Sequence, residues 1–165
     1  MTERPFLVLV PGLFSTEILW QRQVEILSEI ADIHVTQQHL RHDNLEAISE
    51  AILAESPPAF AIAGVSTGGY CALLAHKLGG ERVTGLCLIG STTNLGSESL
   101  GKGLFELEDM VRQEEFERCK QSLISLFLNH DNQRSRSMAT VVDTMVDTVG
   151  VERTLQQLAF LKKGG

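Results

Sequence analysis

Ser66 is placed where a serine could act as a nucleophile. It lies in the sequence Gly-Val-Ser-Thr-Gly-Gly, with Gly64 two residues before it and Gly68 two residues after it. An apolar run, residues 59–63, precedes this sequence, and a run with helical character, residues 70–78, follows it. A serine held in a sharp turn between a strand and a helix adopts a strained backbone conformation, and glycines at these two positions avoid a clash across the turn. The pattern therefore predicts a nucleophile elbow, in which the serine attacks a carbonyl carbon.

A second turn offers the hydrogen-bond donors that such a reaction needs. Residues 5–10 form the first apolar run and lead into Pro-Gly-Leu-Phe, in which Leu13 is the third residue. Backbone N–H groups in a turn of this kind stabilise the negative oxygen of a tetrahedral intermediate. We expect the amides of Leu13 and of Thr67, the residue after the serine, to form the oxyanion hole. The structural alternative is that Ser66 only caps the following helix.

The elements that position these two turns alternate along the chain. Short apolar segments predict strands at residues 6–10, 32–36, 59–63 and 83–89, and helical periodicity predicts helices at residues 16–29, 44–55 and 67–78. Repeated strand, helix, strand order indicates an α/β fold, a parallel sheet with helices on both faces. Ser66 then stands at the carboxyl end of a central strand, where ligands bind in open sheets of this kind.

The rest of the chain is predicted to be helical. After the fourth strand, apolar residues recur only at helical spacing, and Gly150 separates two segments, residues 136–148 and 151–162. We therefore expect one domain with two parts, a core over residues 1–95 and a helical cap over residues 96–165. The cap either covers the mouth of the site or packs on the sheet for stability alone. Its candidates for lining a pocket, for which core packing is the alternative, are Leu104, Phe105, Phe127, Met138 and Met145.

Three stretches of the sequence resemble the α/β-hydrolase superfamily, and more narrowly its small esterase and enol-lactonase-like members. They are residues 7–20, 64–70 and 81–89, and the resemblance covers nearly the whole chain but only the front part of a typical member. It implies a mainly parallel sheet ordered second, first, third, fourth strand. It also implies a serine hydrolase that cleaves a carboxylic ester, thioester or lactone. Members carry His-Gly where this chain has Pro11-Gly12, a change that leaves the backbone donors in place.

The resemblance further implies a carboxylate and a histidine that activate the serine, in the chain order serine, acid, histidine. Both would lie on loops beyond the helical cap, and no strand of that kind follows before Gly165. We therefore expect a truncated chain that is inactive alone. The acid candidate within the chain, Glu98, is expected to be a solvated loop residue. Two other functions stay open: a non-catalytic fragment or ligand-binding module with the same fold, and an acyltransferase that uses the same serine.

The histidines of the chain are not predicted to replace the missing base. His76 follows Ser66 by ten residues along a helix, about 15 Å away, which is beyond hydrogen-bond reach. His34, His39 and His42 are expected to be solvated or to cap turns. His130 is the one remaining downstream candidate, at the end of a helix.

Composition narrows the partners and the compartment. The 165 residues carry 14 Lys and Arg against 21 Asp and Glu, and the net charge of −7 argues against a nucleic acid or an anionic membrane as partner. Cys71, Cys87 and Cys119 have neither C-x-x-C nor metal-ligand spacing, which is typical of a reducing cytoplasm. No leader pattern and no apolar run of membrane-spanning length is found in the sequence.

The expected partner is a small-molecule substrate of ester type. No glycine fingerprint for a nucleotide, no P-loop and no H-E-x-x-H motif occurs, so neither a cofactor nor a metal is expected. A second copy of the chain is the other expected partner. The apolar strand at residues 83–89 would be left at the edge of the sheet, where unpaired backbone groups can bind another strand.

Overall fold

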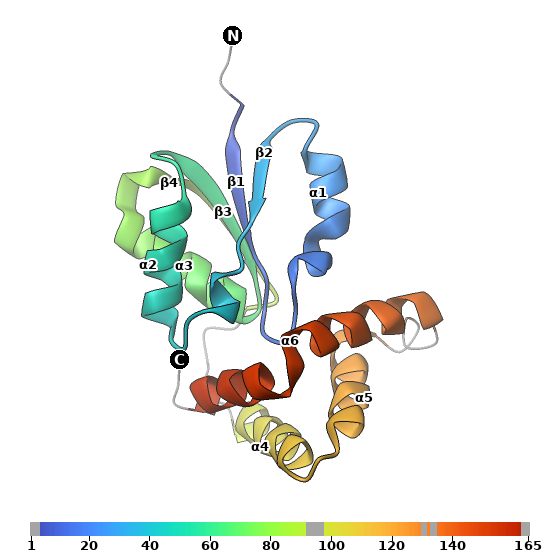
Figure 1. Ribbon diagram of the computed structural model, residues 1–165. Coiled ribbons are helices and arrows are strands. Elements are labelled where there is room, and N and C mark those ends of the chain that lie inside the picture. The colour runs from blue at the N-terminus through green and yellow to red at the C-terminus, as the bar shows by residue number, and fades with distance from the viewer. Residues whose placement is uncertain (1–3, 92–97, 130–131, 133–134, 163–165) are drawn as a thin grey trace. The chain divides into compact units, whose positions relative to one another are not determined.

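The computed structural model describes residues 4–91, 98–129, 132 and 135–162, and the chain divides into two compact units (Figure 1). Met1–Thr93 holds the sheet with its helices, and Asn94–Gly165 contains the remaining helices. Each unit buries apolar side chains of its own.

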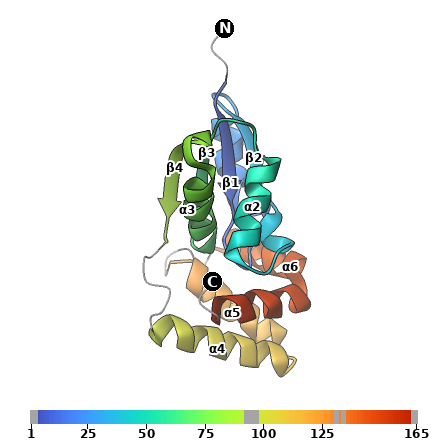
Figure 2. The ribbon, with the colours of Figure 1, turned by 90° about the vertical axis from the view of Figure 1, so that its left-hand side faces the viewer.

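Parallel strands form the sheet of the first unit. They are β1 (Phe6–Val10), β2 (Asp32–Val35), β3 (Phe60–Val65) and β4 (Val83–Ile89). Their order is β2-β1-β3-β4, which confirms the predicted α/β fold and strand order (Figure 2). Val10 pairs with Gly64, and Gly64 pairs with Leu88. The residues that follow these three strands therefore meet at one end of the sheet.

Helices cover both faces of the sheet. Alternate residues of a strand point to opposite faces, so the apolar side chains of β1 are buried on both sides. Val8 packs in the core beneath α2 (Leu45–Glu55) and α3 (Thr67–Gly79). Leu9 packs on the other face, where α1 (Gln21–Leu27) lies (Figure 1). The nucleophile elbow predicted at the end of β3 thus rests on a strand that is covered from both sides.

The helix predicted over residues 16–29 is wrong in its extent. A 3-10 turn, η1 (Glu17–Trp20), comes before the shorter α1 (Gln21–Leu27). Thr16 caps η1, since its hydroxyl accepts a hydrogen bond from the amide of Ile18 at 3.4 Å. Such tight turns are frequent at helix starts, and the helical spacing of apolar residues does not distinguish them from an α-helix.

The other two helices of this unit match their predicted ranges within one residue. Asn44 caps α2, and its side chain accepts a hydrogen bond from the amide of Ala47 at 2.8 Å. Gly80 follows the last residue of α3 at φ 54°, a left-handed conformation that favours glycine. Both ends are therefore set by residues that the sequence makes visible.

The second unit consists of α4 (Glu98–Arg112), α5 (Phe116–Phe127) and α6 (Arg136–Lys162), and each helix contacts the other two. Gly150 breaks α6 with φ 75° and ψ 168°, at the position where the sequence separates two helices. The core of the unit contains Leu107, Val111, Leu123, Val142, Val146 and Leu158. Across the described residues of the chain, no helix combines the length and the apolar character that crossing a bilayer requires.

β4 is the last strand of the sheet on one side. Among the described strands it pairs only with β3. Cys87, Leu88 and Ile89 at its end are exposed. An edge that ends in apolar side chains is a potential site of strand pairing.

Candidate active site

Ser66 has the strained backbone that the sequence predicts for it. Its φ of 53° and ψ of −121° lie in a region that side-chain-bearing residues rarely adopt, and such a residue costs about 1–3 kcal/mol. The conformation is held by the backbone on two sides. The amide of Ser66 donates to the carbonyl of Ile89 at 2.9 Å, and its carbonyl accepts from the amide of Gly69 at 2.9 Å.

The side chain of Ser66 is not used to cap α3. The residue is exposed, and its hydroxyl makes no hydrogen bond to the first turn of the helix. Ser66 therefore occupies the N-cap position of α3 without capping the helix through its side chain.

The glycines around Ser66 are needed because backbone atoms approach them closely. A Cβ atom built on Gly64 would lie 2.1 Å from the carbonyl oxygen of Gly68. One built on Gly68 would lie 2.4 Å from the carbonyl oxygen of Val10 and 2.5 Å from that of Pro11. Real Cβ atoms do not come so near, and backbone atoms cannot move aside. Any larger residue at either position would displace the elbow.

The turn after β1 lies directly against Ser66. A Cβ atom built on Gly12 would lie 3.4 Å from the Cβ of Ser66 and 3.1 Å from the carbonyl oxygen of Val65. This proximity follows from the register of β1 and β3, in which Val10 pairs with Gly64. The structure therefore brings together the two turns that the sequence singles out.

The two predicted oxyanion donors are available. Within the described part of the chain, the amides of Leu13 and Thr67 donate to no protein acceptor. Phe14, next to Leu13, takes a left-handed conformation with φ 58°. Buried backbone N–H groups are almost always paired, so two neighbouring amides left open suit an anion that arrives with the substrate. Their roles, and that of Ser66, stay predictions.

Ser91 is a residue of this region that sequence reasoning missed. It follows β4 through Gly90, and its hydroxyl donates to the carbonyl of Ser66 at 2.9 Å. It also lies so close to Gly69 that a Cβ built there would fall 1.9 Å from its oxygen. The repeated glycine after the elbow is the only sequence signal of this contact, because it leaves room for a neighbour.

No described histidine partners the hydroxyl of Ser66. His76 lies on α3, as predicted, and is exposed. His34 lies 3.1 Å from the carboxylate of Glu55. The expectation that His39 is solvated or caps a turn is wrong: the residue is buried, and its Nε2 lies 2.9 Å from the carbonyl oxygen of Ser15. His130 lies outside the described residues.

Glu55, the partner of His34, joins α2 to the segment after β2. Burial raises the pKa of its carboxyl, but hydrogen bonds from Thr36, Gln38 and His34, with the charge of His34, outweigh burial and leave that pKa below its ordinary value. The bond from Gln38 Nε2 is 2.6 Å long. This carboxylate is engaged in the structure of the first unit and is not near Ser66 in any described contact.

Two cysteines are too buried to be nucleophiles. Burial raises the pKa of the Cys71 thiol to about 12 and that of the Cys119 thiol to about 11. The thiolate is the reactive form, so both are inert near neutral pH. Among the described residues, no group of three or more His, Cys, Asp or Glu side chains is arranged to hold a metal ion.

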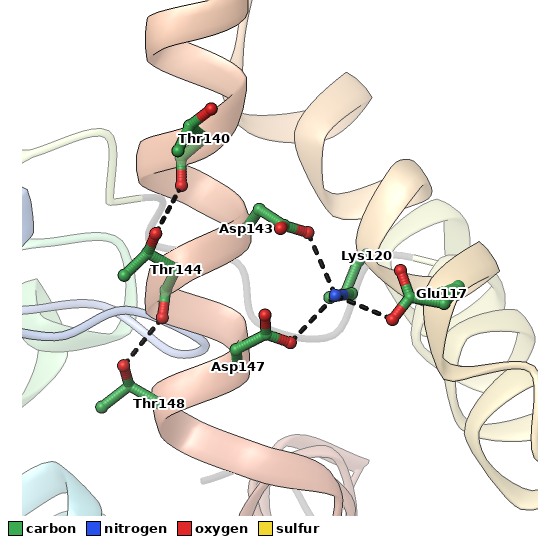
Figure 3. Close-up of polar contacts among 7 residues, drawn as sticks. All are labelled: Glu117, Lys120, Thr140, Asp143, Thr144, Asp147 and Thr148. Atoms are coloured by element: carbon green, nitrogen blue, oxygen red, sulfur yellow. Dashed lines mark hydrogen bonds and ion pairs between the residues drawn. The ribbon is translucent and has the colours of Figure 1, made fainter.

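Lys120 stands in a cluster of charges inside the helical unit (Figure 3). Its Nζ lies 2.8 Å from Glu117 Oε1 on the same helix, and 3.1 Å and 2.9 Å from the Oδ1 atoms of Asp143 and Asp147 on α6. The hydrogen bond to Glu117 and those to the two aspartates raise the pKa of Lys120 above its ordinary value, against the opposing effect of burial. The ammonium group keeps its proton and fastens α5 to α6, so it is not a general base.

The five candidates for lining a pocket divide into two groups. Leu104 and Met145 are buried in the helical unit, which is the core-packing alternative. Phe105, Phe127 and Met138 are exposed. Glu98, expected in a loop, is the first residue of α4.

A curated relative shares part of the sequence, whereas no family model matches the chain. The pimeloyl-[acyl-carrier protein] methyl ester esterase of Photobacterium profundum is 28% identical over 116 residues, which cover 65% of this chain and 46% of that relative. The chain thus spans about half the length of this relative.

Solved structures match almost the whole chain. The enol-lactonase from Burkholderia xenovorans LB400 has a TM-score of 0.82 at 15% identity, over 97% of this chain and 65% of that one. A hydrolase from Pseudomonas aeruginosa PA01 has a TM-score of 0.79 at 16% identity, over 98% and 65% of the two chains. A thermophilic esterase from Thermogutta terrifontis has a TM-score of 0.76 at 16% identity, over 96% and 64%.

The parallel order β2-β1-β3-β4, with a strained serine directly after β3, defines an α/β-hydrolase fold. The similarities to the enol-lactonase, the esterase and the hydrolase confirm that fold, and the curated relative is itself an esterase. The predicted resemblance to α/β hydrolases is therefore confirmed at the level of the fold.

Proposed function

We propose that this chain carries the nucleophile and the oxyanion hole of a serine hydrolase. The observation that carries the proposal is the strained backbone of Ser66 directly after β3, with the Gly12 turn against it. The reaction is cleavage of a carboxylic ester, thioester or lactone. The relative named as a pimeloyl-[acyl-carrier protein] methyl ester esterase favours a carboxylic ester among these substrates.

In this proposal the hydroxyl oxygen of Ser66 attacks the carbonyl carbon while a general base takes the hydroxyl proton. The carbonyl oxygen becomes negative and accepts hydrogen bonds from the amides of Leu13 and Thr67. When the tetrahedral intermediate collapses, the alcohol leaves with a proton from the base. Water then hydrolyses the acyl group from Ser66 by the same steps.

The base and the carboxylate that orients it are proposed to come from residues other than those described around Ser66. No described histidine bonds to that serine, and Glu55 is engaged with Thr36, Gln38 and His34. A chain with only the nucleophile and the oxyanion hole keeps a residual rate enhancement of about 10³–10⁴ over water. The 165-residue chain alone is therefore proposed to be nearly inactive.

Chemical rescue by imidazole tests the proposal directly. Imidazole in solution can take the place of a missing histidine, so it should accelerate release of p-nitrophenol from p-nitrophenyl butyrate by the chain. Ser66→Ala is the matched control, because it removes the hydroxyl and retains the imidazole reaction in solution. A protein-dependent rate that rises with imidazole in the parent and not in Ser66→Ala supports the proposal. Equal rates in both would contradict it and favour the ligand-binding module.

A further inference from the structure

Both predicted oxyanion donors belong to peptide groups whose carbonyl oxygens bind a serine hydroxyl. The carbonyl of Gly12 and the amide of Leu13 form one peptide group, and Ser15 Oγ donates to that carbonyl at 2.7 Å. The carbonyl of Ser66 and the amide of Thr67 form the other, and Ser91 Oγ donates to that carbonyl at 2.9 Å.

A peptide group is planar, so fixing its carbonyl also fixes the direction of its N–H. A hydrogen bond to the carbonyl in addition polarises the peptide group and strengthens its N–H as a donor. The hydroxyls of Ser15 and Ser91 therefore influence the direction and donor strength of the two N–H groups. Neither hydroxyl needs to contact a substrate to do so. Neither amide has an acceptor of its own in the described residues to hold it in place.

Ser15, which makes the first of these bonds, is itself held by a buried histidine. His39 and Ser15 are each 3% exposed, and His39 Nε2 lies 2.9 Å from the carbonyl oxygen of Ser15. Since a carbonyl oxygen only accepts hydrogen bonds, Nε2 must carry a proton and donate it. The histidine thereby connects η2 (Gln38–Leu40) to the turn after β1.

The turn needs such support because it contains a strained residue. Residues 11–16 are all buried, and Phe14 within them has φ 58°. A left-handed conformation at a bulky residue persists only where the surrounding contacts determine it. The bonds from Ser15 and His39 supply contacts of this kind on the residues adjoining Phe14.

We propose that Ser15 and Ser91 are positioning residues of the oxyanion hole, each orienting one donor amide through the carbonyl of the same peptide group, and that His39 holds the first of them in place. This inference rests on the proposed function in so far as the amides of Leu13 and Thr67 bind an oxyanion. It assigns a role to three residues that stand outside the nucleophile and the donors.

The test measures the amides themselves and does not depend on turnover. In the 165-residue chain, ¹⁵N order parameters of Leu13 and Thr67 should be about 0.85, the value of rigid backbone, and Ser15→Ala should lower that of Leu13 to below about 0.6. Ser91→Ala should shift the amide resonance of Thr67. His39→Met should act like Ser15→Ala, whereas His39→Gln, which retains a donor, should resemble the parent.

Ser49→Ala is the control for a lost hydroxyl. Ser49 is buried and donates to the carbonyls of Leu45 and Cys71 at 2.7 and 3.1 Å, away from both turns. It should lower stability without changing the order of Leu13. Unchanged order of Leu13 in Ser15→Ala, or an equal loss in Ser49→Ala, would overturn the proposal.

The rate of imidazole-assisted acylation separates this proposal from the proposed function. If the chain acylates at Ser66, Ser15→Ala and Ser91→Ala should each slow the reaction about tenfold, part of the loss of about 10²–10³ that removal of a donor causes, and Ser91→Thr should restore it. If Ser66 does not acylate in the parent, the proposed function fails while the order parameters still decide the positioning roles.

Discussion

The carboxyl end of the sheet and the Lys120 cluster differ in whether their polar groups have partners within the protein. Lys120 is buried, and each of its contacts goes to a carboxylate of the same helical unit. At the end of the sheet, by contrast, the hydroxyl of Ser66 does not cap its helix, and the amides of Leu13 and Thr67 have no protein acceptor within the described residues. Leaving polar groups unpaired costs stability, so the unpaired set is the one to associate with a ligand.

Backbone strain also differs between the two regions. Among the described non-glycine residues with positive φ, Phe14 and Ser66 lie one in each of the two turns, and Glu114, with φ 60°, lies between α4 and α5. The contacts of Lys120 lie on regular helices, α5 and α6, and need no such conformation. Two strained residues in adjoining turns are consistent with the proposed site, whereas satisfied charges on helices are typical of structural support.

The largest expected effect concerns turnover at Ser66. No described histidine or carboxylate bonds to the hydroxyl of Ser66. Turnover of p-nitrophenyl acetate or butyrate by the chain alone should therefore be negligible, many orders of magnitude below that of a complete triad. Robust hydrolysis that disappears in Ser66→Ala would contradict this expectation. Its further loss in His130→Ala would identify the substitute base.

Leu13→Pro sharpens the assignment of the first donor. Proline lacks the N–H group, so transition-state stabilisation should fall by about 2–4 kcal/mol in the imidazole-assisted reaction. Leu13→Ala retains the N–H and should leave the rate of folded protein nearly unchanged. Circular dichroism checks that both variants fold. Equal rates for the two variants would remove Leu13 from the site.

Lys120→Met tests the structural side of the comparison. The substitution removes the hydrogen bonds to Glu117, Asp143 and Asp147 and should lower the free energy of unfolding by about 2 kcal/mol. Lys102→Met is the matched control, since Lys102 is exposed and lies 4.0 Å from Glu106, and it should cost less than about 0.5 kcal/mol. Denaturant unfolding measures both, and equal losses would show that the cluster is not special.

The raised pKa of Lys120 gives the sign of a pH effect. A folded-state pKa above the unfolded value means that the stabilisation is fully present below the ordinary lysine pKa of about 10.4. It is lost as the pH rises through the folded-state value. The advantage of the parent over Lys120→Met should therefore shrink only in strongly alkaline solution.

Glu55→Gln should have a smaller effect with the opposite pH dependence. The pKa of Glu55 is lowered in the folded state, so its stabilisation is present above the unfolded value of about 4.3 and is lost as the pH falls through the folded-state value. We expect a difference of about 1 kcal/mol or less at neutral pH, because the side chain is partly exposed. Unfolding measured over a series of pH values from 7 into the acid range follows it, and a difference that does not shrink as the pH falls would contradict the assignment.

The smallest expected effect concerns the edge of the sheet. We propose that two copies associate weakly through β4, whose end carries the exposed side chains of Leu88 and Ile89. Leu88→Lys should abolish concentration-dependent light scattering. Leu73→Lys, at a helical position of similar exposure, should not change it. If the apparent mass of the parent from light scattering does not depend on concentration, two copies do not associate through β4.

Much of the fold follows from local sequence patterns, and the details of the site do not. β1 and β4 are short apolar runs with clear boundaries, so both match their predicted ranges. The strand order came from the resemblance to a known family. The start of the first helix differs from its prediction, because the spacing of Trp20 and its apolar neighbours does not distinguish η1 from an α-helix.

The positioning contacts could not be read from the sequence. Ser91 and Ser66 are 25 residues apart, and His39 and Ser15 are 24 apart, so each pair meets only through the parallel sheet. The sequence around a serine or a histidine in a loop does not predict which distant carbonyl oxygen its side chain will bind. The glycines differ, because close backbone approach excludes every side chain and therefore leaves a mark on the sequence.

The central claim is that Ser66 is the nucleophile, and the site of acylation tests it most directly. The chain would be incubated with p-nitrophenyl butyrate and imidazole, and the modified residue would be identified by peptide mass spectrometry. Cys87→Ser serves as background, because Cys87 is an exposed thiol that could take up the acyl group on its own. We expect the butyryl group on Ser66, at a rate that rises with imidazole. A butyryl group on other residues alone, with Ser66 unmodified, would contradict the account.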